Sequence, residues 1–268
     1  MQLADCRVLL TGASGGIGLA LAEALCAGGA RVLTVSRNRD ALEDLLRRYP
    51  DAMSWVGADL REAHERKLVV DAARRLGGVN LLINAAGVNR FALLEQIEES
   101  EIEDMLALNV CATLQLTRAM LPMLRQQPHA LVVNVGSIYG SIGYPGYAVY
   151  CASKFALRGF SEALRRELAD TTVNVLYIAP RATRTSMNSS AAMALNAELK
   201  VGMDEPAYVA QAVIAAIEKN LSELYLGWPE KLFVRINSML PGLIDRALHK
   251  QLPIIRRFTS PTHAKEHS

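Results

Sequence analysis

Short runs rich in Val, Ile and Leu alternate with longer helix-like segments along most of this 268-residue chain. The runs that read as strands cover residues 6–10, 31–35, 53–56, 79–83, 131–135 and 173–178. The segments between them are rich in Ala, Leu, Arg and Glu, which favour helices. Near-continuous apolar strands separated by amphipathic helices are typical of a parallel sheet covered on both faces. The sequence therefore predicts a single α/β domain with a doubly wound, Rossmann-like sheet.

Composition narrows the class of protein and its compartment. With 51% hydrophobic residues, the chain has ample material for one large core, and a net charge of +2 is too small to indicate nucleic acid as the main partner. The four cysteines show no CxxC spacing, and the five histidines show no metal-ligand spacing, so we expect reduced thiols and no metal site. Without a signal peptide or a run long enough to span a membrane, a cytoplasmic protein is expected, peripherally membrane-associated at most.

Two regions depart from the alternating pattern. Residues of about 183–203, rich in Ser, Ala, Met and Asn, follow the last predicted strand, where a mobile lid or an ordinary connecting loop would fit. Residues 1–227 are expected to form the catalytic domain, and residues 228–268 a helical, amphipathic extension of it. From Glu230 onward there are seven Lys and Arg against three Asp and Glu, so this extension is basic.

Three interpretations of the extension stay open. It could pack over a substrate mouth or against a dimer mate, it could touch an anionic membrane, or it could be a solvated end, above all over residues 259–268.

A glycine cluster follows the first predicted strand. Gly12, Gly16 and Gly18 stand between that strand and a helix, in the pattern TGxxxGxG. Glycine permits a tight turn and lets backbone amides approach a pyrophosphate at the N-terminus of a helix. In this strand–turn–helix context the cluster predicts a dinucleotide site rather than a plain turn.

The end of the second predicted strand indicates which dinucleotide is bound. An acidic residue here would pair with the ribose 2′-hydroxyl of NAD, but this chain has Ser36 and Arg37, with a second arginine at position 39. Because guanidinium groups match phosphates well, we expect NADP(H) rather than NAD(H), with Arg37 as the main contact to the 2′-phosphate and Ser36 assisting.

Tyr150 and Lys154 form a second motif, with Ser137 thirteen residues before the tyrosine. Residues four apart lie on one face of a helix, so the phenol and the ammonium are expected side by side. A nearby cation favours the phenolate, so we expect Lys154 to lower the pKa of Tyr150 from its usual value near ~10. Ser137 would hold a substrate oxygen beside the phenol, and a nucleotide with a tuned phenol indicates hydride chemistry.

These motifs, in this order, resemble the short-chain dehydrogenase/reductase family over roughly residues 6–227. Besides the glycine cluster, the resemblance rests on Asp59-Leu60, on the sequence NAAG at 84–87, and on a tetrad of Asn109, Ser137, Tyr150 and Lys154. It implies that Asn109 holds a kink in a long helix and a water linked to Lys154. A helix-capping asparagine is the alternative for that position.

The resemblance also implies further nucleotide contacts. Asp59 would accept a hydrogen bond from the adenine amino group, and Asn84 and Gly87 would support the strand edge beside the adenosine. All expected cofactor contacts together are Gly12, Ser14, Gly16, Ile17, Gly18, Ser36, Arg37, Asp59, Leu60, Asn84, Ala85, Gly87, Tyr150, Lys154, Thr183 and Thr185. Relatives pair through the helices that carry Asn109 and Tyr150, which implies a homodimer or homotetramer.

One position departs from the family pattern Pro-Gly-x-x-x-Thr. Pro180 and Thr185 match, but Arg181 stands in place of the glycine. Because an arginine lacks glycine's conformational freedom, the path of this loop is in question. Arg181 or Arg184 would read an acidic substrate group, such as the phosphate of a phosphopantetheine arm, or both would be structural or solvated.

These observations favour an NADP(H)-dependent oxidoreductase that interconverts a ketone or aldehyde and its alcohol, with Tyr150 as general acid and base. A lid rich in Met and Ala and an apolar extension favour a lipophilic substrate. A reductase of 3-oxoacyl-carrier-protein or acyl-CoA thioesters is the nearest alternative. A catalytically silent NADP(H)-sensing or scaffold protein is an alternative of another class, and it would require a defective tetrad.

Overall fold

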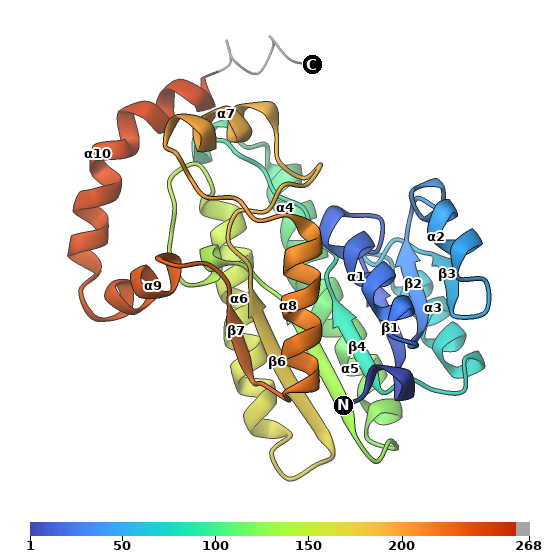
Figure 1. The fold of residues 1–268 in the computed structure, drawn as a ribbon. Helices are drawn as coiled ribbons and strands as arrows, with labels where there is room; N and C mark the ends of the chain where they lie inside the picture. Colours follow the sequence, from blue (N-terminus) through green and yellow to red (C-terminus); the bar gives the residue numbers. More distant parts are fainter. Residues whose placement is uncertain (261–268) are drawn as a thin grey trace.

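The computed structural model describes residues 1–260 of the chain. Its centre is a parallel sheet with strand order β3-β2-β1-β4-β5-β6-β7 (Figure 1). The strands are β1 (Arg7–Thr11), β2 (Arg31–Ser36), β3 (Met53–Gly57), β4 (Leu81–Asn84), β5 (Ala130–Val135), β6 (Val173–Ala179) and β7 (Glu223–Tyr225). The order reverses between β1 and β4, so the predicted doubly wound α/β fold is confirmed.

Helices cover both faces of the sheet because neighbouring strand residues point to opposite sides. Val8 and Leu10 face one layer, and Leu9 between them faces the other, all fully buried. On the side of Val8 the helices are α1 (Gly16–Ala27), α2 (Glu43–Arg48) and α8 (Pro206–Glu218). On the side of Leu9 they are α3 (Ala63–Arg75), α5 (Thr113–Leu124) and α6 (Ala148–Glu167). This two-sided burial explains why the central strands read as unbroken apolar runs.

The remaining elements lie around the carboxyl ends of the strands or join the layers. They are the short 3₁₀ turns η1 (Leu3–Asp5), η2 (Asp40–Leu42), η3 (Leu94–Gln96) and η5 (Ile138–Gly140), the helices α4 (Glu99–Leu106) and α7 (Ser190–Glu198), and the π-helical segment η4 (Ala107–Ala112). The segment η4 joins α4 to α5. The predicted lid, at about 183–203, contains α7, and an isolated β-bridge between Thr183 and Asp204 joins the two ends of this segment.

The C-terminal extension forms two helices, α9 (Glu230–Met239) and α10 (Pro241–Thr259), at the side of the domain near α7 (Figure 1). Val234 of α9 is buried against the η5 region, and Ile255 of α10 is fully buried beside Phe91 and Tyr147. The extension thus packs on the domain, and contact with a dimer mate or with an anionic membrane stays a prediction. The solvated end expected for residues 259–268 lies mostly outside the described residues. No helix within residues 1–260 is both long and apolar enough to cross a bilayer.

Candidate active site

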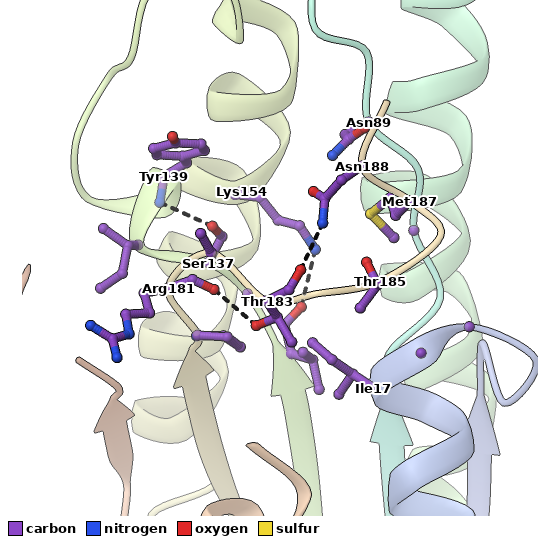
Figure 2. A pocket seen from close by; sticks show the side chains of 18 of the residues that line it. Ile17, Asn89, Ser137, Tyr139, Lys154, Arg181, Thr183, Thr185, Met187 and Asn188 are labelled. Carbon is purple, nitrogen blue, oxygen red and sulfur yellow. Dashed lines mark hydrogen bonds between the residues drawn. The ribbon is translucent and has the colours of Figure 1, made fainter. Parts of the chain in front are cut away.

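A pocket lies at the carboxyl edge of the sheet, between the loop after β1 and the segment after β6 (Figure 2). Of the residues expected at the site, the pocket lining includes Gly12, Gly16, Ile17, Gly18, Ala85, Gly87, Ser137, Tyr150, Lys154, Thr183 and Thr185. These residues come from segments up to about 170 positions apart, which the parallel topology brings to one edge. The structure therefore joins the glycine cluster, the tyrosine motif and the lid in one cavity.

The glycine cluster has the shape that a phosphate cradle requires. Gly12 has a φ of +68°, and a Cβ there would lie 2.7 Å from the backbone of Ala85. A Cβ on Gly18 would collide with the carbonyl of Gly12. The helix α1 begins at Gly16, and no side chain caps its first turn. The first-turn amides and the positive end of the helix dipole are therefore free to meet an anion, and the residues fit the diphosphate of a dinucleotide.

Thr11 is a supporting residue that sequence reasoning did not single out. Its Oγ1 accepts hydrogen bonds from the backbone nitrogens of Ala85 and Ala86, at 3.1 and 3.2 Å. The first strand thereby holds the loop after β4 against the glycine turn. Its place in the glycine motif is the one signal that could have drawn attention to it.

Asn84 supports the edge of strand β4, as the resemblance implied. Its side chain is buried inside the domain and donates to Thr117 Oγ1 at 3.0 Å and to Asn134 Oδ1 at 2.8 Å. Asn134 in turn donates to Ser161 at 2.8 Å. Asn84 thus joins β4 to β5 and to the helices behind them, and it is not part of the pocket lining. A direct contact of Asn84 with the cofactor stays a prediction.

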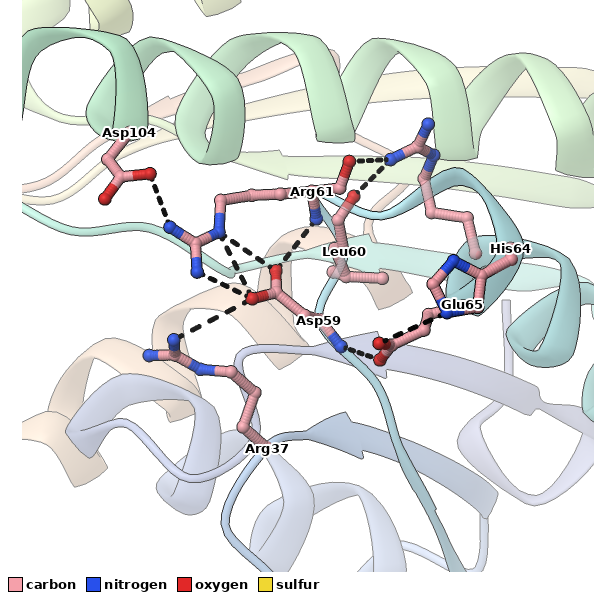
Figure 3. Close-up of polar contacts among 8 residues, drawn as sticks. Arg37, Asp59, Leu60, Arg61, His64, Glu65 and Asp104 are labelled. Carbon is pink, nitrogen blue, oxygen red and sulfur yellow. Dashed lines mark hydrogen bonds and ion pairs between the residues drawn. The ribbon is translucent and has the colours of Figure 1, made fainter. Parts of the chain in front are cut away.

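Asp59, expected at the adenine, is held by an arginine that follows it (Figure 3). The guanidinium of Arg61 donates to both carboxylate oxygens, and the Arg61 backbone nitrogen donates to Oδ1 at 2.9 Å. This hydrogen bonding from Arg61 is the largest cause that lowers the pKa of Asp59 to about 2. Arg61 also bonds Asp104 of α4 at 2.5 Å, so the loop after β3 is fixed to the neighbouring helix.

The end of β2 presents the residues expected to distinguish NADP from NAD. Arg37 is 67% exposed, with Nη1 3.9 Å from the Asp59 carboxylate. The Ser36 hydroxyl donates to the Asn38 carbonyl at 2.8 Å and accepts from Trp55 Nε1 at 3.1 Å. These residues, together with Ser14, Asp59 and Leu60, lie outside the pocket lining described above. Their contacts with a nucleotide remain predictions.

Asn109 stands in the π-helical segment η4, so the expected irregularity in the long helix is present. Its Oδ1 accepts from the Val88 nitrogen at 2.8 Å, and its Nδ2 donates to the Val88 carbonyl at 2.9 Å. The same Nδ2 lies 3.0 Å from Ser153 Oγ on α6. Asn109 therefore clamps the loop after β4 to the helix that carries Tyr150, and the helix-capping alternative is wrong.

Ser137 and Tyr150 meet in the pocket. Ser137 follows β5 and caps η5, where its Oγ accepts from the Tyr139 nitrogen at 3.1 Å. Its hydroxyl also acts on the Tyr150 phenol in the direction that lowers the pKa of that phenol. Two hydroxyl groups from separate elements thus line the same pocket.

The prediction that Lys154 lowers the pKa of Tyr150 is wrong for this structure. Burial raises the pKa of Tyr150 to about 12, against a smaller opposing effect of the hydrogen bond to Ser137. Lys154 Nζ lies 5.6 Å from the centroid of the Tyr150 ring and donates to the Val135 carbonyl at 3.1 Å. Burial lowers the pKa of Lys154 to about 8. Desolvation by the surrounding protein has the largest effect on both groups, with Lys154 buried and Tyr150 partly buried at the pocket.

Beyond the phenol, the pocket has a wall of aromatic side chains. Tyr147 lies 6.1 Å from Tyr150 and 5.2 Å from Tyr139, between ring centroids. The lid adds Met187 and Val201, and asparagines also line the cavity at positions 89, 188 and 196. The lining is therefore mixed in polarity.

Arg181 takes part in an ion-pair network at the rim of the pocket. Its Nη2 donates to Asp204 Oδ1 at 2.7 Å, and its Nη1 lies 3.5 Å from Glu230 Oε1. Asp204 follows the lid and Glu230 begins α9, so one side chain joins the loop after β6 to both. Arg184 is paired with Glu205 at 3.1 Å on the surface. Both arginines thus have carboxylate partners, which favours the structural alternative over recognition of an acidic substrate group.

Comparison with known proteins agrees with this site. The short chain dehydrogenase family model matches residues 7–196. An uncharacterised oxidoreductase, YxnA of Bacillus subtilis, is 30% identical over all of this chain and 78% of its own length. Carbonyl reductase family member 4 of Xenopus laevis is 33% identical over 77% of this chain and 89% of its own. The 3-oxoacyl-[acyl-carrier-protein] reductase FabG of Vibrio cholerae is 31% identical over 80% and 90%.

Solved structures show the same fold with a nicotinamide cofactor. A short chain dehydrogenase from Burkholderia cenocepacia in complex with NADP is 28% identical, with a TM-score of 0.79 over 92% of this chain and 99% of that one. A short chain dehydrogenase/reductase from Burkholderia phymatum in complex with NAD is 23% identical and shares the fold, with a TM-score of 0.80 over 91% and 96%. With the family model matching most of the chain, and with Ser137, Tyr150 and Lys154 in one pocket with the glycine cradle, this protein belongs to the short-chain dehydrogenase/reductase family of oxidoreductases.

Proposed function

We propose that this protein is an NADPH-dependent reductase that converts the carbonyl group of a lipophilic ketone or aldehyde to an alcohol. The observation that carries the proposal is the meeting of Ser137, Tyr150 and Lys154 in the cavity that the glycine loop opens into. A nicotinamide coenzyme supplies hydride chemistry when bound. The protein itself must then hold the substrate oxygen and provide a proton.

The geometry supports Tyr150 as the proton donor. A carbonyl oxygen within reach of the Ser137 and Tyr150 hydroxyls would accept hydrogen bonds from both, which polarises the carbonyl bond. With a pKa of about 12, the phenol is protonated at neutral pH, as a donor to a developing alkoxide must be. Lys154, with a pKa of about 8, is mostly protonated there and stabilises the phenolate once its proton has left.

NADPH is preferred over NADH in this proposal because of the end of β2. Arg37 is exposed and basic at the position where an NAD site presents an acidic residue, and no Asp or Glu lies between Val35 and Arg39. Arg39 lies over the Trp55 ring, with Cζ 5.7 Å from the centroid, and adds a second positive charge. The two guanidinium groups make this rim attractive to a 2′-phosphate.

A lipophilic substrate is supported by the wall of Tyr139 and Tyr147 and by Met187 of the lid. Such a wall stacks well on flat or branched apolar groups. The second candidate function, reduction of 3-oxoacyl thioesters, is favoured by the likeness to the Vibrio cholerae reductase. Arg181 and Arg184 do not add to it, since each is paired with a carboxylate.

The test is a two-stage measurement on the full chain. Binding of NADPH and NADH is compared first by calorimetry, and oxidation of the preferred coenzyme is then followed with a panel of steroids, fatty aldehydes and acetoacetyl thioesters. The proposal expects tighter binding of NADPH and turnover of an apolar carbonyl. Faster turnover of the thioester would favour the second candidate. Binding of NADPH with no turnover across the panel would refute both and support a silent NADP(H)-sensing protein.

A further inference from the structure

The helix α9 turns its apolar side away from the domain. Its inward position is Val234, which is buried near Ile138 and Tyr177. At 100° per residue, Leu232 and Met239 lie on the opposite side of the helix, and Phe233 lies about 100° from Val234, on the flank away from Arg235. All three are exposed, with Met239 79% exposed. An amphipathic helix on a protein surface normally turns its apolar side toward the core and its polar side toward water.

Neighbouring residues enlarge this apolar surface. Trp228, just before α9, is 73% exposed, and Leu240 and Leu243 at the turn into α10 are more than half exposed. We name this surface the apolar cap; its residues are Trp228, Leu232, Phe233, Met239, Leu240 and Leu243. In Figure 1 the turn between α9 and α10 stands at the outer side of the molecule, away from the sheet. A group of exposed large apolar side chains such as this marks an interaction site.

Four of the six Asp, Glu, Lys and Arg side chains around the apolar cap are positive. Lys231, Arg235, Arg246 and Lys250 are exposed, and none of them takes part in a salt bridge within residues 1–260. On α9, Lys231 and Arg235 lie about 60° and 100° from the buried Val234, beside the apolar side.

The acidic residues of this region do not balance those cations. Between residues 228 and 250 the acidic side chains are Glu230 and Asp245. Glu230 is paired with Arg181, and Asp245 lines a groove between α10 and the loop at Tyr144. The cations around the cap are therefore available to an outside partner.

We propose that the apolar cap and its four cations dock the protein on an anionic lipid surface. Aromatic and aliphatic side chains flanked by Lys and Arg are the composition of helices that lie in the membrane interface. A second copy of this chain fits less well, because a twofold contact would bring the same patch against itself and set like charges face to face. Anionic headgroups would instead neutralise them.

The helices that carry the apolar cap also contact the pocket and its lid. Glu230 at the start of α9 lines the pocket, and α10 packs against α7 of the lid. A docked protein would therefore present the rim of its cavity near the lipid surface. The inference rests on the surface alone, so it stands or falls independently of the proposed reaction.

Vesicle co-sedimentation of the full chain tests the proposal. Vesicles of phosphatidylcholine alone are compared with vesicles that also contain phosphatidylglycerol, at low and high salt. Each cation near an anionic surface is worth roughly fivefold in partitioning. We expect binding at least about tenfold stronger to the anionic vesicles, and reduced by salt.

Two variants probe the two parts of the surface. The double variant M239S/L240S and the charge reversal R235E/K250E should each weaken binding at least about tenfold. Leu68→Ser and Lys219→Glu, at exposed positions on other faces, are matched controls and should bind as the unaltered protein does. Thermal unfolding confirms that all variants remain folded.

Several outcomes would overturn the proposal that the apolar cap docks on anionic lipid. Equal sedimentation with both vesicle types, or no sedimentation at all, would overturn the proposal, as would cap variants that bind like the controls. Light scattering coupled to gel filtration covers the remaining alternative. If the cap variants convert a dimer to a monomer and the unaltered protein ignores anionic vesicles, the apolar cap is an interface between copies of this chain.

Discussion

Replacing Lys154 with Met should abolish turnover and at the same time stabilise the protein, in a manner that depends on pH. Lys154 is buried and has no carboxylate partner among the residues described, and burial lowers its pKa from 10.5 to about 8. At about 1.4 kcal/mol for each pKa unit, holding the charge costs about 3 kcal/mol well below pH 8. Between the two pKa values the folded state binds fewer protons than the unfolded state, so stability rises with pH through that window.

Urea unfolding at about pH 7 and about pH 10 measures this effect. Met cannot ionise, so its stability advantage over Lys154 should shrink by about 2–3 kcal/mol between the two pH values. The lost hydrogen bond to Val135 is common to both conditions and cancels in this comparison. Lys67→Met, at an exposed position, is the control and should show no such trend. An advantage that stays constant with pH would refute the claim that Lys154 is a desolvated cation.

Three further variants test other parts of the site. Arg37→Asp should lower the preference for NADPH over NADH at least about tenfold in calorimetry, and an unchanged ratio would remove Arg37 from the 2′-phosphate site. Asn109→Ala leaves the Val88 nitrogen and carbonyl without their partner, and should lower the free energy of unfolding, measured in urea, by about 1–3 kcal/mol. A loss below about 0.5 kcal/mol would argue against the role of Asn109 in holding the loop after β4 to α6. Arg181→Ala leaves two carboxylates near each other and should lower the free energy of unfolding by about 1–3 kcal/mol, a range already reduced for partial exposure. Arg184→Ala, at the surface, should lower it by less than about 0.5 kcal/mol. Equal losses in the two variants would contradict the ion-pair network of Arg181.

The central strands could be predicted because they are buried on both faces, so each reads as an unbroken apolar run. The edge strand β7 could not, because Glu223–Tyr225 has only three residues and pairs with β6 alone. The length of α10 could not be predicted either, because the helix runs through Pro253, a residue type that usually ends a helix, to Thr259. Proline is tolerated there because it lies on the exposed side, where water can satisfy the carbonyl it leaves unpaired.

The site was predictable where local spacing fixes geometry. Tyr150 and Lys154 share a face of α6 because four residues make about one turn, and the glycines mark the turn after β1. What failed depends on surroundings that spacing does not contain. The pKa of Tyr150 is set mainly by desolvation at the pocket, and the partners of Arg181 come from the far end of the lid and from α9.

The central claim is that the Tyr150 hydroxyl gives its proton to a carbonyl oxygen in the pocket it shares with Ser137 and Lys154. Tyr150→Phe removes one oxygen atom and keeps the ring that packs against Tyr147. Measured with the best carbonyl substrate, kcat should fall by about 10²–10⁴-fold while the Kd for NADPH changes less than about twofold. A variant that retains the original kcat would contradict the account.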